Sequence, residues 1–146
     1  MYKKILLAYN ATAHSRFALR QAAELAKLCH AQLHMLGIVV TTGGITIAQS
    51  TSSIDLLSEE HKRIEQALVA VSAELRLREI DVMTYKAQGE PSVIITSHAA
   101  KIGADLIVIG HTSRTLLARW FQSSTGAKLL DNLACSLLIA NPTREL

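Results

Sequence analysis

Short apolar runs alternate along the chain with longer segments whose apolar residues recur at helical spacing. The first run, over residues 5–9, is apolar at almost every position, which is typical of a strand covered on both faces. Because parallel strands joined by helices need right-handed crossovers, this alternation predicts a doubly wound α/β domain. We expect a five-stranded parallel sheet flanked by about four helices, with strands over residues 5–9, 33–40, 80–87, 105–109 and 136–140.

The segments between these runs carry helix signals. Residues 57–78 are the clearest, because Ile64, Leu68, Val71 and Leu75 recur three or four positions apart. The Thr/Gly/Ser-rich stretch before this helix, over residues 41–53, has no period and predicts a loop. Further helices are predicted from a cap at Thr12 or Ser15 to Cys29, from Pro91 to Gly103, and from about 125 to 133.

The composition suits one folded domain spanning residues 1–146, since 49% of the residues are hydrophobic and 18% are charged. The net charge of +3 is spread along the chain, so we expect no nucleic-acid partner. No apolar run approaches the ~20 residues that cross a bilayer, so we expect no membrane association and a cytoplasmic location. Cys29 and Cys135 lack the spacing of zinc ligands, and a reducing compartment fits them.

Ligands of doubly wound sheets bind beyond the carboxyl ends of the strands, where the strand order reverses. The turns to search therefore lie at Asn10, after Val40 and at Gly110. The segment from Gly110 to Gly126 is rich in hydroxyls, and its hydroxyl cluster over residues 123–125 precedes a predicted helix whose free N–H groups suit phosphate. The alternative is that these hydroxyls only cap the helix.

Two polar residues at these turns could contact a ligand. Asn10 could hydrogen-bond a ribose or an adenine edge, or it could instead bond its own backbone in the turn. His111 follows Gly110 directly and could contact a bound group. No G-x-x-x-x-G-K-[ST] loop, G-x-S-x-G elbow, H-E-x-x-H helix or G-x-G-x-x-G turn is present, so no catalytic residue and no metal ligand is predicted.

Three segments together are similar to one known family. They are Tyr2–Ser15, the Gly89-Glu-Pro91 turn with the later Gly103-Ala-Asp-Leu-Ile-Val-Ile-Gly110, and Lys128–Ala140. On these residues the sequence resembles the universal stress proteins over essentially its whole length. The resemblance implies a small α/β domain. Some members of that family bind nucleotides, and others bind none.

Binders in that family carry G-x-x-G, nine residues, then G-[S/T]. This pattern falls on Gly110, Ser113, Ser123 and Ser124, so the first glycine and the final hydroxyl are kept. Serines at the other two places add a side chain where the backbone would approach phosphate. The resemblance implies a cleft for ATP or AMP that is degraded by these losses. Mg²⁺ is uncertain, because an Asn–Ala pair replaces an aspartate and a glycine in the first turn.

The cleft that the resemblance implies has three parts: the first turn, the backbone after the second strand, and the long loop after the fourth. Its residues are Tyr9, Asn10, Ala11, Thr12, Ile38, Val39, Gly110, His111, Ser113, Arg114, Ser123, Ser124 and Thr125.

The resemblance also implies a stress-response regulatory protein that forms a homodimer through its closing strand and acts on an unknown protein partner. Leu137, Leu138 and Ile139 would form the paired edge. Alternatively, residues 141–146 shield that edge. Two other functions stay open: a slow nucleotide hydrolase, for which the loop shows no base or metal carboxylate, and a dimeric scaffold that binds no nucleotide.

Overall fold

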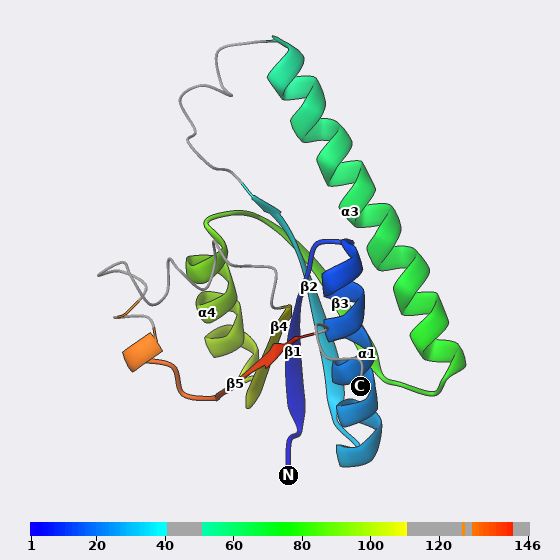
Figure 1. Ribbon diagram of the computed structural model, residues 1–146, viewed down its shortest axis with the longest axis vertical. Coiled ribbons are helices and arrows are strands. Elements are labelled where there is room, and N and C mark those ends of the chain that lie inside the picture. The colour runs from blue at the N-terminus through cyan, green and yellow to red at the C-terminus, as the bar shows by residue number, and fades with distance from the viewer. Residues whose placement is uncertain (41–50, 111–126, 128–129, 142–146) are drawn as a thin grey trace.

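A computed structural model describes residues 1–40, 51–110, 127 and 130–141 of the chain (Figure 1). The strands are β1 (Lys4–Tyr9), β2 (Gln32–Val40), β3 (Val82–Gly89), β4 (Leu106–Gly110) and β5 (Ser136–Ala140). The helices with defined bounds are α1 (Ala13–Cys29), α3 (Thr51–Leu77) and α4 (Pro91–Ile102). Residues 127, 130 and 131 are also helical, inside the last predicted helix, the rest of which lies outside the described residues.

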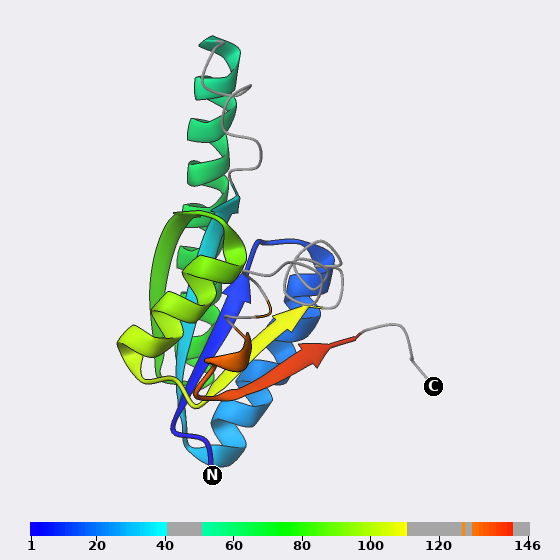
Figure 2. The same cartoon turned by 90° about the vertical axis from the view of Figure 1, so that its left-hand side faces the viewer.

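The strands form a five-stranded sheet in the order β3-β2-β1-β4-β5, and every neighbouring pair is parallel. The chain moves outward from β1 to β2 and β3, then crosses back to β4 and β5 on the other side of β1 (Figure 2). The predicted doubly wound α/β class is confirmed. The strand order therefore reverses between β1 and β4.

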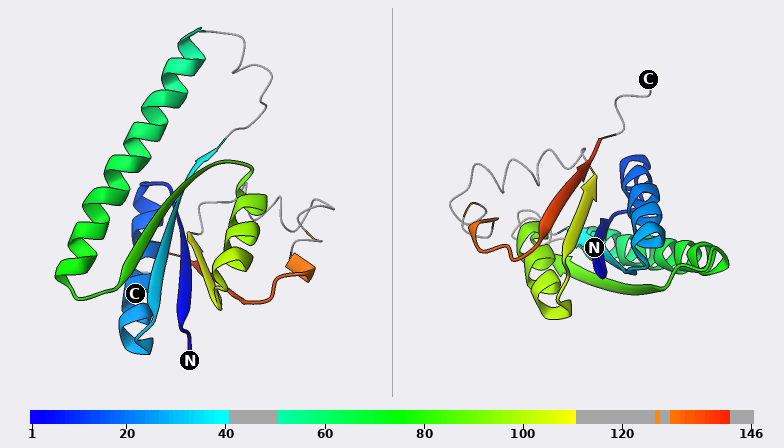
Figure 3. Two further views of the ribbon diagram at one scale, coloured as in Figure 1. Left: turned by 180° about the vertical axis from the view of Figure 1, so that it is seen from behind. Right: turned by 90° about the horizontal axis from the view of Figure 1, so that it is seen from below.

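Helices cover both faces of this sheet (Figure 3). On β1, Ile5, Leu7 and Tyr9 face the core beneath α1 and α3, whereas Leu6 joins the core beneath α4. All four side chains are at most 2% exposed. The unbroken apolar run at the start of the sequence is thus explained by a strand that is buried on both faces.

Helix α3 begins at Thr51, so the prediction of a loop through residue 53 and a helix from residue 57 was wrong at this boundary. The N-terminal half of α3 extends past the sheet and the body of the domain (Figure 1). Apolar periodicity arises where a helix packs on a core, so it could not mark the turns that project beyond one. The predicted loop over residues 41–50 lies outside the described residues.

The predicted strand over residues 80–87 is displaced to 82–89. Ile80 is buried but precedes β3, because its N–H donates to the carbonyl of Leu75 and closes the end of α3. The expected position of this strand at a sheet edge is confirmed, because β3 is the outermost strand next to β2.

Gly103 ends α4 with φ 69°, in the left-handed conformation that glycine adopts without strain. Within the described residues, no helix has the length and apolarity to span a bilayer.

Candidate functional site

The carboxyl ends of β1 and β4 part at the point where the strand order reverses. Paired residues of these strands stop at Leu7 and Val108, although β1 continues to Tyr9 and β4 to Gly110. In contrast, β1 stays paired with β2 through Tyr9, and β4 stays paired with β5 through Gly110. Among the described residues, the pairing of β1 with β4 thus ends two residues before Tyr9 and Gly110, while the pairs on either side continue to these residues. Figure 2 shows the sheet from the side on which these strands can be followed.

The turn after β1 forms one wall of this opening. The Oδ1 atom of Asn10 accepts hydrogen bonds from the backbone N–H of Thr12 at 3.2 Å and from its hydroxyl at 2.7 Å. Ala11 between them has φ 61°, in the left-handed region. The interpretation of Asn10 as a turn residue that bonds its own backbone is confirmed. Its side-chain oxygen is engaged, and its Nδ2 points away from Thr12.

Thr12 and Ser15 join this turn rigidly to α1. The Thr12 hydroxyl accepts from the backbone N–H of Ser15 at 3.3 Å, and the Ser15 hydroxyl accepts from the backbone N–H of Thr12 at 3.0 Å. These reciprocal bonds are a capping box, so both residues that the sequence offered as caps take part. No acidic residue stands in the first turn of α1, and the positive end of its dipole faces this edge of the sheet.

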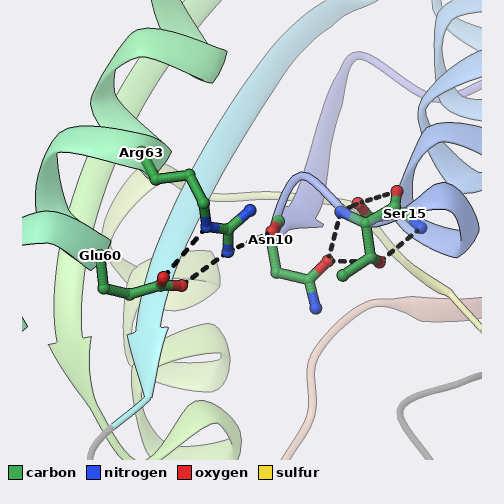
Figure 4. A network of polar contacts seen from close by, with 5 residues as sticks. Asn10, Ser15, Glu60 and Arg63 are labelled. Carbon is green, nitrogen blue, oxygen red and sulfur yellow. Dashed lines mark hydrogen bonds and ion pairs between the residues drawn. The ribbon is translucent and has the colours of Figure 1, made fainter. Parts of the chain in front are cut away.

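Arg63 of α3 reaches the same turn from the other side (Figure 4). Its Nη2 donates to the backbone carbonyl of Asn10 at 3.0 Å and to Glu60 at 2.6 Å, while its Nε donates to the second Glu60 oxygen at 3.0 Å. The hydrogen bond with Arg63 lowers the pKa of the Glu60 carboxyl, and the same bond raises the pKa of the guanidinium. From the sequence, Arg63 is only one of several polar residues opposite the apolar stripe of its helix.

The end of β2 forms a further part of this edge. β2 is paired with β1 only as far as Gly37, and it continues beside β3 through Ile38 and Val39 to Val40. The side chains of Ile38 and Val39 are buried. Beyond the end of β1, therefore, the β2 backbone rather than its side chains borders the opening.

Comparison with known proteins decides the family. The model of the universal stress protein family matches residues 1–141. The chain belongs to the universal stress protein family. It is 31% identical over 147 residues to universal stress protein YxiE of Bacillus subtilis, covering 95% of this chain and 99% of that one. It is 27% identical over 146 residues to universal stress protein MJ0531 of Methanocaldococcus jannaschii, covering 99% and 85%.

Solved universal stress protein structures share the fold. One from Burkholderia pseudomallei has 25% identity and a TM-score of 0.71, covering 94% of this chain and 95% of its own. A universal stress protein in complex with cAMP has a TM-score of 0.67 at 18% identity, covering 94% and 96%. One from Archaeoglobus fulgidus in complex with dAMP has a TM-score of 0.63 at 18% identity, covering 94% and 97%.

The structure places about half of the predicted cleft residues of this universal stress protein. Tyr9 to Thr12 and Gly110 lie at the parted ends of β1 and β4, and Ile38 and Val39 lie on the neighbouring β2. Gly110, expected as the turn after the fourth strand, is instead its last residue. The remaining predicted residues lie outside the described residues: His111, Ser113, Arg114, Ser123, Ser124 and Thr125.

The described part of the cleft offers no carboxylate ligand for a metal ion. Asn10 is neutral and its Oδ1 is bonded to Thr12, and Glu60 is paired with Arg63. Across the described residues, no three His, Cys, Asp or Glu side chains gather where they could hold a metal. The residues of the first turn therefore do not fit Mg²⁺ as direct ligands.

Proposed function

We propose that this chain binds an adenine nucleotide at the parted carboxyl ends of β1 and β4. The observation that carries the proposal is the separation of these two strands beyond Leu7 and Val108, at the reversal of strand order. Open α/β sheets place their ligands at such a point because the loops there diverge and leave a crevice. The complexes of related folds with cAMP and dAMP support an adenine nucleotide as the ligand class.

The groups around the opening suit the parts of such a ligand. The backbone of Ile38 and Val39 beyond the end of β1 supplies donors and acceptors for the adenine edge. The Nδ2 of Asn10 points away from its own turn (Figure 4), so it is free of the bonds that hold Oδ1 and would donate to a ribose hydroxyl. The N-terminal dipole of α1, whose first turn carries no acidic residue, and the hydroxyls of residues 123–125 favour the phosphates.

Binding is tested by thermal melting and calorimetry with ATP, AMP, cAMP and dAMP, with GTP as a matched control. A ligand at about 100 times its Kd stabilises the folded state by about 2.7 kcal/mol, which gives a clear rise in Tm. We expect a rise with at least one adenine nucleotide and a smaller one with GTP. No rise with any adenine nucleotide would leave the non-binding scaffold as the function.

The two serines in the motif provide a sharper test of the ligand's place. In Ser113→Gly/Ser123→Gly we expect tighter ATP binding, because the double variant restores the small residues of the family's phosphate motif. Equal affinity in the two proteins would show that these serines do not limit binding. Because no carboxylate of the first turn is available, we expect addition of Mg²⁺ to change AMP affinity little.

We propose further that the protein is a homodimeric regulator of a stress response, pairing through β5. This strand is at the edge of the sheet, with β4 on its inner side. Leu137, Leu138 and Ile139 are half-buried in the monomer, so a second copy would bury more of their apolar surface. The output would then be recognition of a protein partner.

Sedimentation velocity over a range of concentrations tests the dimer. Leu137→Lys places a charge on the proposed interface, and Leu56→Lys places the same charge on a leucine of α3 that is 65% exposed. We expect a dimer for the wild type and for Leu56→Lys, and a monomer with an unchanged circular dichroism spectrum for Leu137→Lys. A monomeric wild type would contradict the proposal.

A further inference from the structure

The strained turn at the candidate cleft is held by hydrogen bonds to both the side chain and the backbone carbonyl of Asn10. Ala11 has φ 61°, in the left-handed region. This conformation raises the free energy of any residue that has a Cβ atom. The side chain of Asn10 is bonded to Thr12, and the backbone carbonyl of Asn10 is bonded to Arg63 of α3. The first contact is local to the turn, whereas the second comes from a residue 53 positions away.

The Arg63 contact sets the direction of a whole peptide group. A planar trans peptide holds its C=O and its N–H on opposite sides, and the described part of the chain has no cis bond. Since the Asn10 carbonyl points toward α3, the N–H of Ala11 points away from α3. Reversing this peptide group would break the bond to Arg63.

Glu60 in turn fixes Arg63. Both oxygens of its carboxylate accept from the guanidinium, in the two-bond geometry that orients the planar group most strictly. The pair lies on successive turns of one helix, and its side chains are 46% and 39% exposed. Such an exposed pair adds little to global stability. Its effect should therefore be local, on the orientation of the Arg63 fork at the turn.

We infer that Arg63 is a positioning residue, which, with Glu60, holds the turn from Asn10 to Thr12 in the shape that the nucleotide cleft requires. The inference rests on the proposed nucleotide function. It makes α3 the element that sets one wall of the cleft, although no part of α3 was predicted to belong to it. Arg63 acts on the ligand through the backbone of Asn10.

The matched variants are Arg63→Met and Lys86→Met. Lys86 of β3 forms an ion pair with Glu65 of α3 at 3.4 Å, and β2 lies between β3 and the strand that leads into the first turn. Each variant thus removes one half-exposed cation paired to α3. We expect both to keep a Tm close to that of the wild type.

Amide hydrogen exchange in the ligand-free protein tests the positioning role directly. The Thr12 N–H is bonded to both Asn10 and Ser15, so its exchange reports on the shape of the turn. We expect Arg63→Met to exchange this proton about threefold to tenfold faster and Lys86→Met to leave it unchanged. Glu60→Gln should fall between Arg63→Met and the wild type. Unchanged exchange in Arg63→Met would overturn the inference.

Calorimetry with AMP tests the consequence for binding. We expect AMP affinity to fall about threefold to tenfold in Arg63→Met and not in Lys86→Met. Faster exchange with unchanged AMP affinity would overturn the link between the turn and the cleft. If the wild type binds no adenine nucleotide, the proposed function fails, while the exchange experiment still decides whether Arg63 holds the turn.

Discussion

Gly37 of β2 and Ile64 of α3 pack so closely that a Cβ atom on Gly37 would lie 2.5 Å from Cγ2 of Ile64. The same atom would lie 2.8 Å from Cδ1 of Leu68. This close approach seats α3 on the sheet one residue away from Arg63. The depth at which the helix lies therefore determines whether Arg63 reaches the turn after β1.

Gly37→Ala should destabilise the protein. The added methyl group cannot be accommodated without moving Ile64, which is fully buried, so we expect a loss of about 1–3 kcal/mol in urea denaturation. Removing the obstructing side chain in the double variant Gly37→Ala/Ile64→Ala should make the combined cost smaller than the sum of the two single costs. Additive costs would argue against a direct clash.

Ala11→Gly should stabilise the protein by about 0.5–1 kcal/mol. Glycine adopts φ 61° without the penalty of a Cβ atom, and the gain is only partly offset by the greater freedom of glycine in the unfolded chain. The comparison variant is Ala73→Gly, at an exposed position inside α3, which should lose about 1 kcal/mol. Chemical denaturation of both variants measures this opposite response.

Stability should fall in mild acid because of a cluster of three rings where α4 packs on the sheet. His34 is stacked on Tyr85, with Nδ1 3.0 Å from the phenol oxygen, and Tyr85 meets His98 edge to face. Burial lowers the pKa of His34, and the charges of Lys4 and His98 lower it further, whereas Asp81 opposes this shift. Burial, and then Lys101, lowers the pKa of His98, whose buried Nε2 finds no hydrogen-bond partner among the described residues.

The sign of this pH dependence follows from the two lowered pKa values. The unfolded chain, with histidine near pKa 6.5, binds protons more readily than the folded one. The contribution to stability is therefore complete above pH 6.5 and is lost as the pH falls below it through the folded pKa. His98→Phe keeps a ring against Tyr85 without a titrating nitrogen. Urea denaturation at about pH 7.5 and about pH 5 should show a smaller acid loss in this variant.

Asp105→Ala should destabilise the sheet at the amino ends of its strands. The Asp105 carboxylate accepts from the backbone N–H of Lys3 at 2.8 Å and of Lys4 at 3.2 Å, which ties the start of β1 to the start of β4. Loss of both bonds should lower the free energy of unfolding by about 1–3 kcal/mol. Asp105→Asn keeps one acceptor oxygen and should lose less. Thermal and urea denaturation of the two variants would show this order, and equal losses would contradict it.

The first turn shows most clearly how much could be predicted from the sequence. That Asn10 and Gly110 lie at neighbouring strand ends follows from the alternation of strands and helices, because parallel strands end at one edge of a sheet. Ala11 could be recognised as a departure from the family's turn glycine, and its positive φ shows the physical reason for glycine there. The start of α3 was missed because its first turns lie beyond the sheet and carry no periodic signal.

The sequence alone determined the α/β class, the strands buried on both faces and the residues of the first turn, because each is written in local spacing and in the polarity of short segments. Only the tertiary structure decided that Arg63 belongs to that turn. Helical periodicity places Arg63 on the polar side of its helix, but the neighbour it meets depends on how α3 crosses the sheet. That crossing is set by the packing of Ile64 on Gly37, two residues that are far apart in the sequence.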